Sequence, residues 1–177
     1  MLARVLSGFS CPKNQDVANF FKEERGGIYQ KESVSYIPCV FRGKQGTAWI
    51  FYPCIKAVVS QGETVSKTTK RKLLRISELD EKSDTYTMSA YLIAQLGKNY
   101  TNGANEKITG KELVELAWTV IEDAQYMLGG IVTFLEAENE EKLLSFYRDN
   151  RFSQFDTRQT ASDAEESHEL VQLLRLL

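Results

Sequence analysis

The sequence predicts one domain of mixed α/β or α+β class over residues 1–177, and three observations support this prediction. A length of 177 residues suits a single domain. An apolar content of 42% beside 26% charged residues is ordinary for a globular chain with a sizeable core. The second half reads as strand, loop, helix, strand, helix, strand, and a helix between two strands favours a parallel pair.

The first half is expected to supply one helix and two strands. Residues 14–24 carry apolar side chains at helical spacing behind a polar cap. Residues 33–41 and 47–60 are rich in aromatic and β-branched residues, which is typical of paired strands. Residues 61–85 are polar and charged, so we expect a long connecting segment with a short helix around 70–79.

The second half begins with the most strand-like run, residues 86–98, which is apolar on both faces and is therefore placed centrally in the sheet. A loop over 99–107 leads into a helix that starts near 110 and ends at the Gly129-Gly130 pair. Apolar residues recur at helical spacing through this helix: Leu113, Leu116, Ala117, Val120, Ile121, Ala124, Met127 and Leu128.

The remaining elements follow in short alternation. Residues 131–138 read as a strand, 139–150 as a helix and 151–158 as a strand. The last ten residues, 168–177, fit either a strand or a helix.

Charge is unevenly distributed although the formal net charge is only −2. The stretch "KTTKRKLLR" (67–75) carries five basic residues, and "SDAEESHE" (162–169) carries four acidic ones. Both stretches fit solvated loops on opposite sides of the molecule. The basic stretch also fits a patch that meets a polyanion such as RNA.

Several classes of protein are disfavoured. Cys11, Cys39 and Cys54 form no CxxC pair, so we expect reduced thiols in a cytoplasmic protein and no metal site. No apolar run approaches the length of about 18 residues needed to span a membrane, and no signal peptide is recognisable. His168 is the only histidine, so no His-based metal cluster or convincing Ser-His-Asp triad can form.

The start of the helix near residue 110 has two interpretations. Thr109 followed by Glu112 is the pattern of a capping box, in which each side chain accepts a hydrogen bond from the other's amide. The same free amides can instead bind a phosphate, with Gly110 allowing close approach and Lys111 adding charge. The stretch is not a Walker A loop, because Glu112 stands where Ser or Thr is required and Asn105 where the first Gly is required.

Two further side-chain types can carry chemistry. Tyr147 lies on the apolar face of the helix over 139–150, where it either packs in the core or acts as a general acid. Glu136 and Glu138 lie at the carboxyl end of the strand 131–138, where carboxylates often line a ligand crevice or are simply solvated.

The order of four segments resembles the second half of a GCN5-related N-acetyltransferase, or GNAT. These are "SAYLIAQLGKN", "ITGKELVELAWTVIEDAQ", "IVTFLEAEN" and "EKLLSFYRDNRF". The ending "FYRDNRF" is similar to the family's recurrent "FYEKxGF". The start "FSCPKNQDVANFFKEE" is similar to the opening of toxin-like and phage-borne members.

The resemblance implies a mixed, mostly antiparallel twisted sheet, flanked by helices and splayed between its fourth and fifth strands. It implies that acetyl-CoA lies in that splay, that Tyr147 protonates the leaving thiolate, and that Glu136 or a water takes up a proton. It also implies a set of cofactor-binding residues: Ile93, Ala94, Gln95, Leu96, Thr109, Gly110, Lys111, Glu112, Leu113 and Asn139.

The resemblance also implies the activity, transfer of an acetyl group from acetyl-CoA to an amine. The acceptor is left open among a small molecule, a peptide and an aminoacyl-tRNA, with a homodimer as a possible assembly and no membrane partner. Glu112 and Val114 depart from the family's phosphate loop, where small residues are expected. The alternative function is therefore a binding or regulatory module that keeps the fold without efficient catalysis.

Overall fold

The computed structural model describes residues 9–13, 15, 17–18, 39–42, 45–61, 66–160 and 167–177. Most of the helix expected over 14–24, most of the strand expected over 33–41 and the acidic residues at 163–166 lie outside the described residues.

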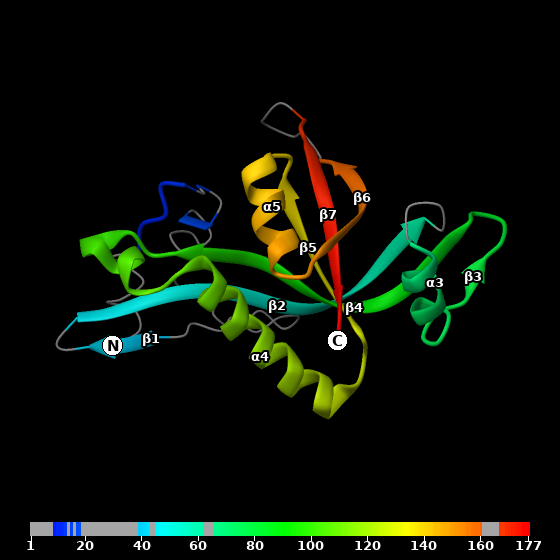
Figure 1. Ribbon diagram of the computed structural model, residues 1–177, viewed down its shortest axis with the longest axis horizontal. Helices are drawn as coiled ribbons and strands as arrows, with labels where there is room; N and C mark the ends of the chain where they lie inside the picture. Colours follow the sequence, from blue (N-terminus) through cyan, green and yellow to red (C-terminus); the bar gives the residue numbers. More distant parts are fainter. Residues whose placement is uncertain are drawn as a thin grey trace. The chain divides into compact units, whose positions relative to one another are not determined.

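The described strands form one seven-stranded sheet. Six of them are hydrogen-bonded in the order β1-β2-β4-β5-β7-β6, and the short strand β3 pairs only with β4. The strands are Cys39–Arg42 (β1), Gln45–Gln61 (β2), Leu79–Asp80 (β3), Thr85–Lys98 (β4), Val132–Glu138 (β5), Ser153–Gln159 (β6) and Glu169–Leu176 (β7). The helices of the described part are Lys67–Leu73 (α3), Gly110–Leu128 (α4) and Glu141–Asp149 (α5), with a 3₁₀ helix over Thr101–Lys107 (η2). The mixed α/β class predicted from the sequence is confirmed (Figure 1).

The sheet is mostly antiparallel, and the pair β4–β5 is parallel. Their ladder consists of two pairs, Tyr91 with Thr133 and Leu92 with Phe134. Both strands continue beyond it, β4 to Lys98 and β5 to Glu138. The ladder between the fourth and fifth strands therefore ends at Leu92 and Phe134 although both strands continue, and the splay implied by the resemblance stays a prediction.

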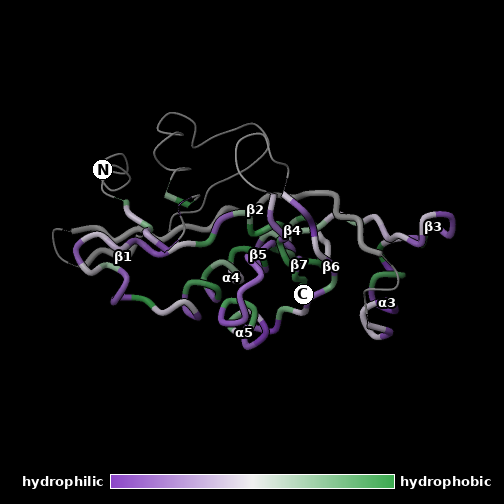
Figure 2. The backbone as a smooth tube through the Cα atoms, turned by 90° about the horizontal axis from the view of Figure 1, so that it is seen from above, coloured by the Kyte–Doolittle hydropathy of each residue, from purple (hydrophilic) through white to green (hydrophobic). Residues whose placement is uncertain are grey.

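The chain divides into two compact units, which are described separately. One contains residues 1–54 and 93–123, and the other contains residues 55–92 and 124–177. In the second unit β7 lies between β5 and β6, antiparallel to both, and α5 packs against β5 (Figure 1). Hydrophobic residues run along β5 and β7 (Figure 2). The core of this unit is formed by Leu73, Tyr86, Met88, Ala90, Val132, Phe134, Phe155 and Leu174.

In the first unit the N-terminal segment is tied to the end of β4. The Asn99 side chain accepts hydrogen bonds from the amides of Ser10 at 3.2 Å and Thr101 at 3.0 Å. The Tyr100 amide donates to the Ser10 carbonyl at 2.7 Å. Cys11 is a buried cysteine in this region, as expected from the sequence.

Two local predictions need correction. The helix expected within the connecting segment 61–85 begins earlier than predicted, at Lys67. Ser66 caps it by accepting a hydrogen bond from the Thr69 amide at 3.1 Å. The expected loop over 99–107 contains the 3₁₀ helix η2, in which Asn102 and Gly103 adopt positive φ angles. The C-terminal segment is a strand, so that open alternative is resolved.

The long helix α4 ends at Gly129 and Gly130, both at positive φ, as predicted. Only part of its regularly spaced apolar residues is buried. Leu116, Met127 and Leu128 are 38%, 73% and 69% exposed. The buried stripe is shorter and includes a residue that was not assigned to it: Leu113, Val114, Ala117 and Ile121.

Candidate functional site

The start of α4 forms a complete capping box. The Thr109 amide donates to Glu112 Oε2 at 2.7 Å, and the Thr109 hydroxyl donates to the same oxygen at 2.8 Å. The Glu112 amide donates to Thr109 Oγ1 at 3.1 Å. The hydrogen bond from the Thr109 amide is the main reason that the pKa of the Glu112 carboxyl lies below its usual value. Glu112 is therefore an ionised cap residue near neutral pH.

The cap leaves part of the helix start available to a ligand. The Leu113 amide donates to the Thr109 carbonyl at 3.2 Å, and the Thr109 and Glu112 amides are used by the cap. Within the described residues, the amides of Gly110 and Lys111 have no acceptor. Two adjacent N–H groups with the partial positive charge of a helix start can bind an anion.

The end of β4 contacts this helix start. Leu96 packs against the buried side chains of Ile108 and Leu113, and Lys98 Nζ donates to the Ile108 carbonyl at 2.8 Å. The residues implied to hold pantetheine, Ile93, Ala94, Gln95 and Leu96, thus lie on the strand that leads directly to the two free amides. Lys111 forms an exposed pair with Glu115 at 3.7 Å, so its charge is partly balanced.

Tyr147 is a buried phenol on α5. Its side chain is 8% exposed and makes edge contacts with the rings of Phe146 and Phe152, at centroid distances of 5.2 and 5.8 Å. Burial raises the pKa of Tyr147 to about 12, because the phenolate cannot be solvated there. The hydroxyl therefore keeps its proton throughout the physiological pH range, as a proton donor must.

Glu136 is held by Gln172 of the neighbouring strand β7 and by Arg158 of β6, the strand beyond it. Glu136 Oε1 accepts from Arg158 Nε at 2.8 Å and from Gln172 Nε2 at 2.7 Å, and Oε2 accepts from Arg158 NH2 at 2.6 Å. The hydrogen bond with Glu136 is also the main reason that the pKa of Arg158 is raised. A carboxylate paired in this bidentate way is a poor proton acceptor, because protonation would break the pair.

The other strand-end side chains form a surface network. Glu138 lies 3.1 Å from His168 Nε2, and Asn139 donates to Glu169 at 3.0 Å. The single histidine is therefore paired with a carboxylate. Among the described residues no group of His, Cys, Asp and Glu could hold a metal ion. No helix in this part of the chain is long and apolar enough to cross a membrane.

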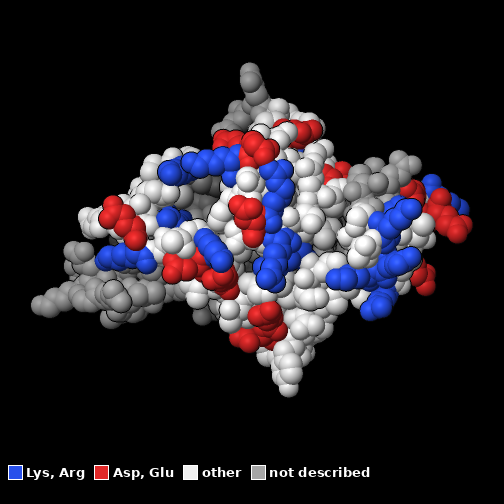
Figure 3. All heavy atoms as spheres, in the orientation of Figure 1, with Lys and Arg blue, Asp and Glu red and all other residues white. Residues whose placement is uncertain are grey.

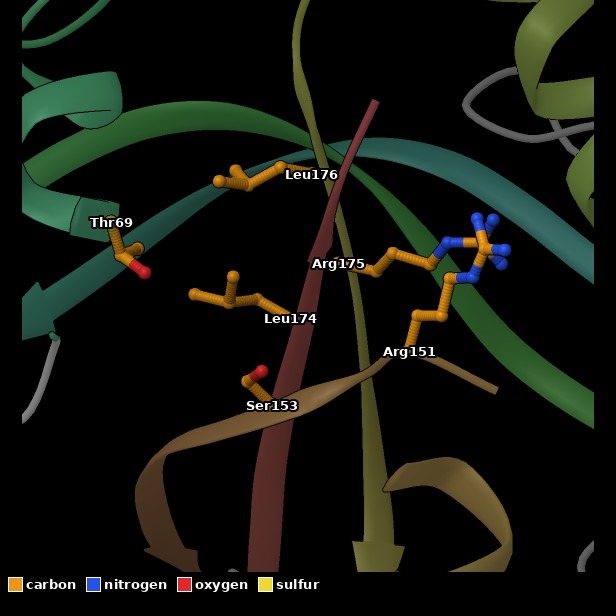
Figure 4. A pocket seen from close by; sticks show the side chains of 6 residues that line it. All are labelled: Thr69, Arg151, Ser153, Leu174, Arg175 and Leu176. Atoms are coloured by element: carbon orange, nitrogen blue, oxygen red, sulfur yellow. The ribbon is translucent and has the colours of Figure 1, made fainter. Parts of the chain in front are cut away.

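The second unit also contains a pocket that was not anticipated from the sequence (Figure 4). Two arginines that are distant in sequence line it, Arg151 after α5 and Arg175 on β7, together with Thr69, Ser153, Leu174 and Leu176. The sequence contains no signal that joins these positions, because they come from a helix, a turn and two strands.

The sequence matches no protein-family model, and a search of curated proteins finds no match either. Solved structures with the same fold do match. One is AtaT complexed with acetyl-methionyl-tRNAfMet, with a TM-score of 0.62, 18% identity and coverage of 94% of this chain and 85% of that chain. Another is a tyrosine-to-phenylalanine mutant of KacT, with a TM-score of 0.60, 17% identity and coverage of 97% and 86%.

A third match is NAA60 from Arabidopsis thaliana in complex with a bisubstrate analogue. Its TM-score is 0.54, its identity 11%, and the coverage 90% of this chain and 83% of that chain. At these identities the matches establish the fold, which is the GNAT fold expected from the sequence.

Proposed function

We propose that this protein is an N-acetyltransferase that transfers an acetyl group from acetyl-CoA to an amine. The observation that carries the proposal is the helix start of α4, where the amides of Gly110 and Lys111 have no acceptor in the described part of the chain. The extended end of β4 leads into this site, and the shared fold supports the same activity. A related structure is AtaTR bound with AcCoA, with a TM-score of 0.58.

In the first unit, the proposed role of Gly110 and Lys111 is to bind the pyrophosphate through their amides. The proposed role of Ile93 to Leu96 is to pair with pantetheine through their backbone, since β4 has left its ladder with β5 at Leu92. Hydrogen bonds from strand amides also stabilise the negative charge that develops on a thioester oxygen during attack by an amine.

In the second unit, the proposed role of Tyr147 is to donate a proton to the departing thiolate. Acetyl transfer forms a C–N bond, breaks the C–S bond, and releases one proton from the attacking amine. The thiolate accepts the phenolic proton, and the phenolate recovers a proton from solvent. We assign the amine proton to water, since Glu136 is engaged by Arg158 and Gln172.

Among possible acceptors we propose the amino group of an aminoacyl-tRNA. AtaT, whose structure was solved in complex with acetyl-methionyl-tRNAfMet, matches over 94% of this chain. The basic residues of 67–75 form an exposed helix here, which suits contact with a nucleic acid. A small molecule or a peptide would not need such a helix. A homodimer remains a prediction, and light scattering of the purified protein tests it.

The test has two stages. Thermal melting with millimolar acetyl-CoA should raise Tm by several degrees, because a ligand at about 100 times its Kd stabilises by about 2.7 kcal/mol. Mass spectrometry should then detect acetylated aminoacyl-tRNA after incubation with acetyl-CoA. Tyr147→Phe should keep the Tm shift and lose most of the turnover. An unchanged Tm with millimolar acetyl-CoA would refute the enzyme proposal.

The second candidate function is a regulatory module, and the position of Glu112 favours it. The ionised carboxylate lies at the helix start, where it opposes a second anion. This function predicts little or no Tm shift with acetyl-CoA and no acetyl transfer to any aminoacyl-tRNA, and efficient acetyl transfer would exclude it.

A further inference from the structure

We propose that the pocket lined by Arg151 and Arg175, together with the basic face of α3, seats backbone phosphates of an RNA. This proposal rests on the proposed function only in its choice of RNA as the polyanion. The pocket and its charge belong to the second unit and are independent of the helix start of α4.

The pocket brings two guanidinium groups together. Arg151 and Arg175 both line it, with the hydroxyls of Thr69 and Ser153 and with no acidic residue among the lining side chains. In Figure 4 the two arginine side chains extend toward each other and away from Thr69 and Ser153, and Arg175 also donates to the Asn150 carbonyl at 3.4 Å. A guanidinium group only donates hydrogen bonds, so two of them side by side match the oxygens of a phosphate.

Arg151 adopts a conformation that is unfavourable for an arginine. Its φ angle is 67°, in the left-handed region where glycine is preferred. The family ending "FYEKxGF", to which "FYRDNRF" is similar, has glycine at the position of Arg151. The chain thus has a long, positively charged side chain at a position where glycine would relieve the backbone strain. Strained residues of this kind are concentrated at ligand sites, where the side chain offsets the cost.

A second group of positive charges lies on α3. Figure 3 shows lysine and arginine side chains gathered over this helix, next to the carboxylates of the β3–β4 turn. Thr69 and Lys70 are half-buried and precede the buried Leu73 by one helical turn, so they lie on the face directed toward the pocket. Within the described residues, no salt bridge neutralises the basic residues of this helix and its C-terminal turn: Lys67, Lys70, Arg71, Lys72 and Arg75.

A cluster of cations on α3 beside a pocket lined by two arginines suits RNA better than an acidic protein segment. RNA presents phosphates at regular spacing, and each phosphate that is neutralised releases counterions. The chain as a whole has a net charge of −2, so binding must depend on this local surface and not on a general attraction.

The experiment measures the affinity of the full chain for a fluorescently labelled, non-acylated tRNA transcript by anisotropy between 50 and 200 mM salt. The variants are Arg151→Gly, Arg151→Lys and Lys70→Gln, with Lys142→Gln as the matched control. Lys142 is an exposed lysine in the first turn of α5, so its variant removes one charge away from the pocket. The Tm of each variant is recorded with and without acetyl-CoA.

Arg151→Gly should weaken tRNA binding about five- to tenfold and reduce the salt slope by about one, since one phosphate contact is lost. Arg151→Lys should retain most of the affinity, Lys70→Gln should weaken binding about threefold, and Lys142→Gln should change nothing. Arg151→Gly should also melt no lower than the unmodified chain, because glycine is at ease at this φ. A structural role of Arg151 would instead lower Tm.

Three results would overturn the proposal: no tRNA binding at 50 mM salt, equal affinities for Arg151→Gly and Lys142→Gln, or competition by polyglutamate as effective as that by unlabelled tRNA. The last result would assign the surface to an acidic protein. Failure of the proposed function is distinguishable, since it abolishes the acetyl-CoA shift in every variant and leaves the tRNA affinities in the expected order.

Discussion

Burial of the Tyr147 hydroxyl predicts a specific loss of stability at alkaline pH. The pKa of Tyr147 is raised from 10.0 to about 12 by burial. Unfolded chains release this proton near pH 10, whereas the folded protein retains it until about pH 12. The folded state therefore binds more protons in this window, and stability that is complete below pH 10 is lost as pH rises through it.

The magnitude follows from the shift. One pKa unit corresponds to about 1.4 kcal/mol, so Tyr147 alone should lower the free energy of unfolding by about 1.4 kcal/mol between pH 8 and pH 11. Tyr147→Phe removes this contribution. The side chain is 8% exposed, so solvent screening reduces the effect little.

Urea unfolding of both proteins at pH 8 and pH 11 measures the effect, because other titrating groups cancel in the comparison. The stability difference between Tyr147→Phe and the unmodified chain should move in favour of the variant by about 1.4 kcal/mol at pH 11. Burial also raises the pKa of Tyr91, so phenolate absorbance should show a late-titrating component that decreases by one tyrosine in Tyr147→Phe. Parallel loss of stability in both proteins would refute the reasoning and show that the hydroxyl is solvated.

Three further perturbations test the fold and the site. Gly97→Ala places a Cβ 2.6 Å from Val17 Cγ1 and should lower the free energy of unfolding, measured in urea, by about 1–3 kcal/mol. Thr109→Ala should lower it by about 1 kcal/mol through loss of the helix cap, while Thr119→Ala, an exposed position in the same helix, should have almost no effect. Glu136→Gln should leave acetyl transfer within twofold, and a loss of tenfold or more would identify Glu136 as the proton acceptor.

The elements of the second half could be predicted because their signals are local. The apolar run of β4, the periodicity of α4 and the glycines after it depend on neighbours within a few residues. The buried length of α4 could not be predicted, because whether Leu116 or Met127 is covered depends on which side chains lie opposite. The start of α3 was missed although the Ser66 cap is a local signal, because Leu73 is the only residue of this short helix that is buried and the apolar periodicity is therefore weak.

The same distinction applies to the site. The capping box was predictable because both hydrogen-bonding partners lie three residues apart. The hydrogen bonding of the Glu136 carboxylate could not be predicted, because its partners Arg158 and Gln172 are 22 and 36 residues away in sequence. The convergence of Arg151 with Arg175 depends on the pairing of β6 with β7 and could not be read from either sequence segment.

The capping box and the phosphate site compete for one helix start, and this competition can be measured. Glu112→Gln keeps an oxygen that accepts from the Thr109 amide but removes the negative charge beside the amides of Gly110 and Lys111. If a pyrophosphate binds there, removal of this charge should raise the affinity for acetyl-CoA about two- to fivefold, because neighbouring negative charges repel each other even at a solvent-exposed site. Asp123→Asn, an exposed position on the same helix, is the control and should not change the affinity.

The pKa of Glu112 is lowered, so its carboxylate stays charged at neutral pH. The affinity for acetyl-CoA should therefore show no step until the pH falls below 4.5, the usual pKa of a glutamate. Isothermal titration with both variants measures this, and equal affinities would place the pyrophosphate elsewhere.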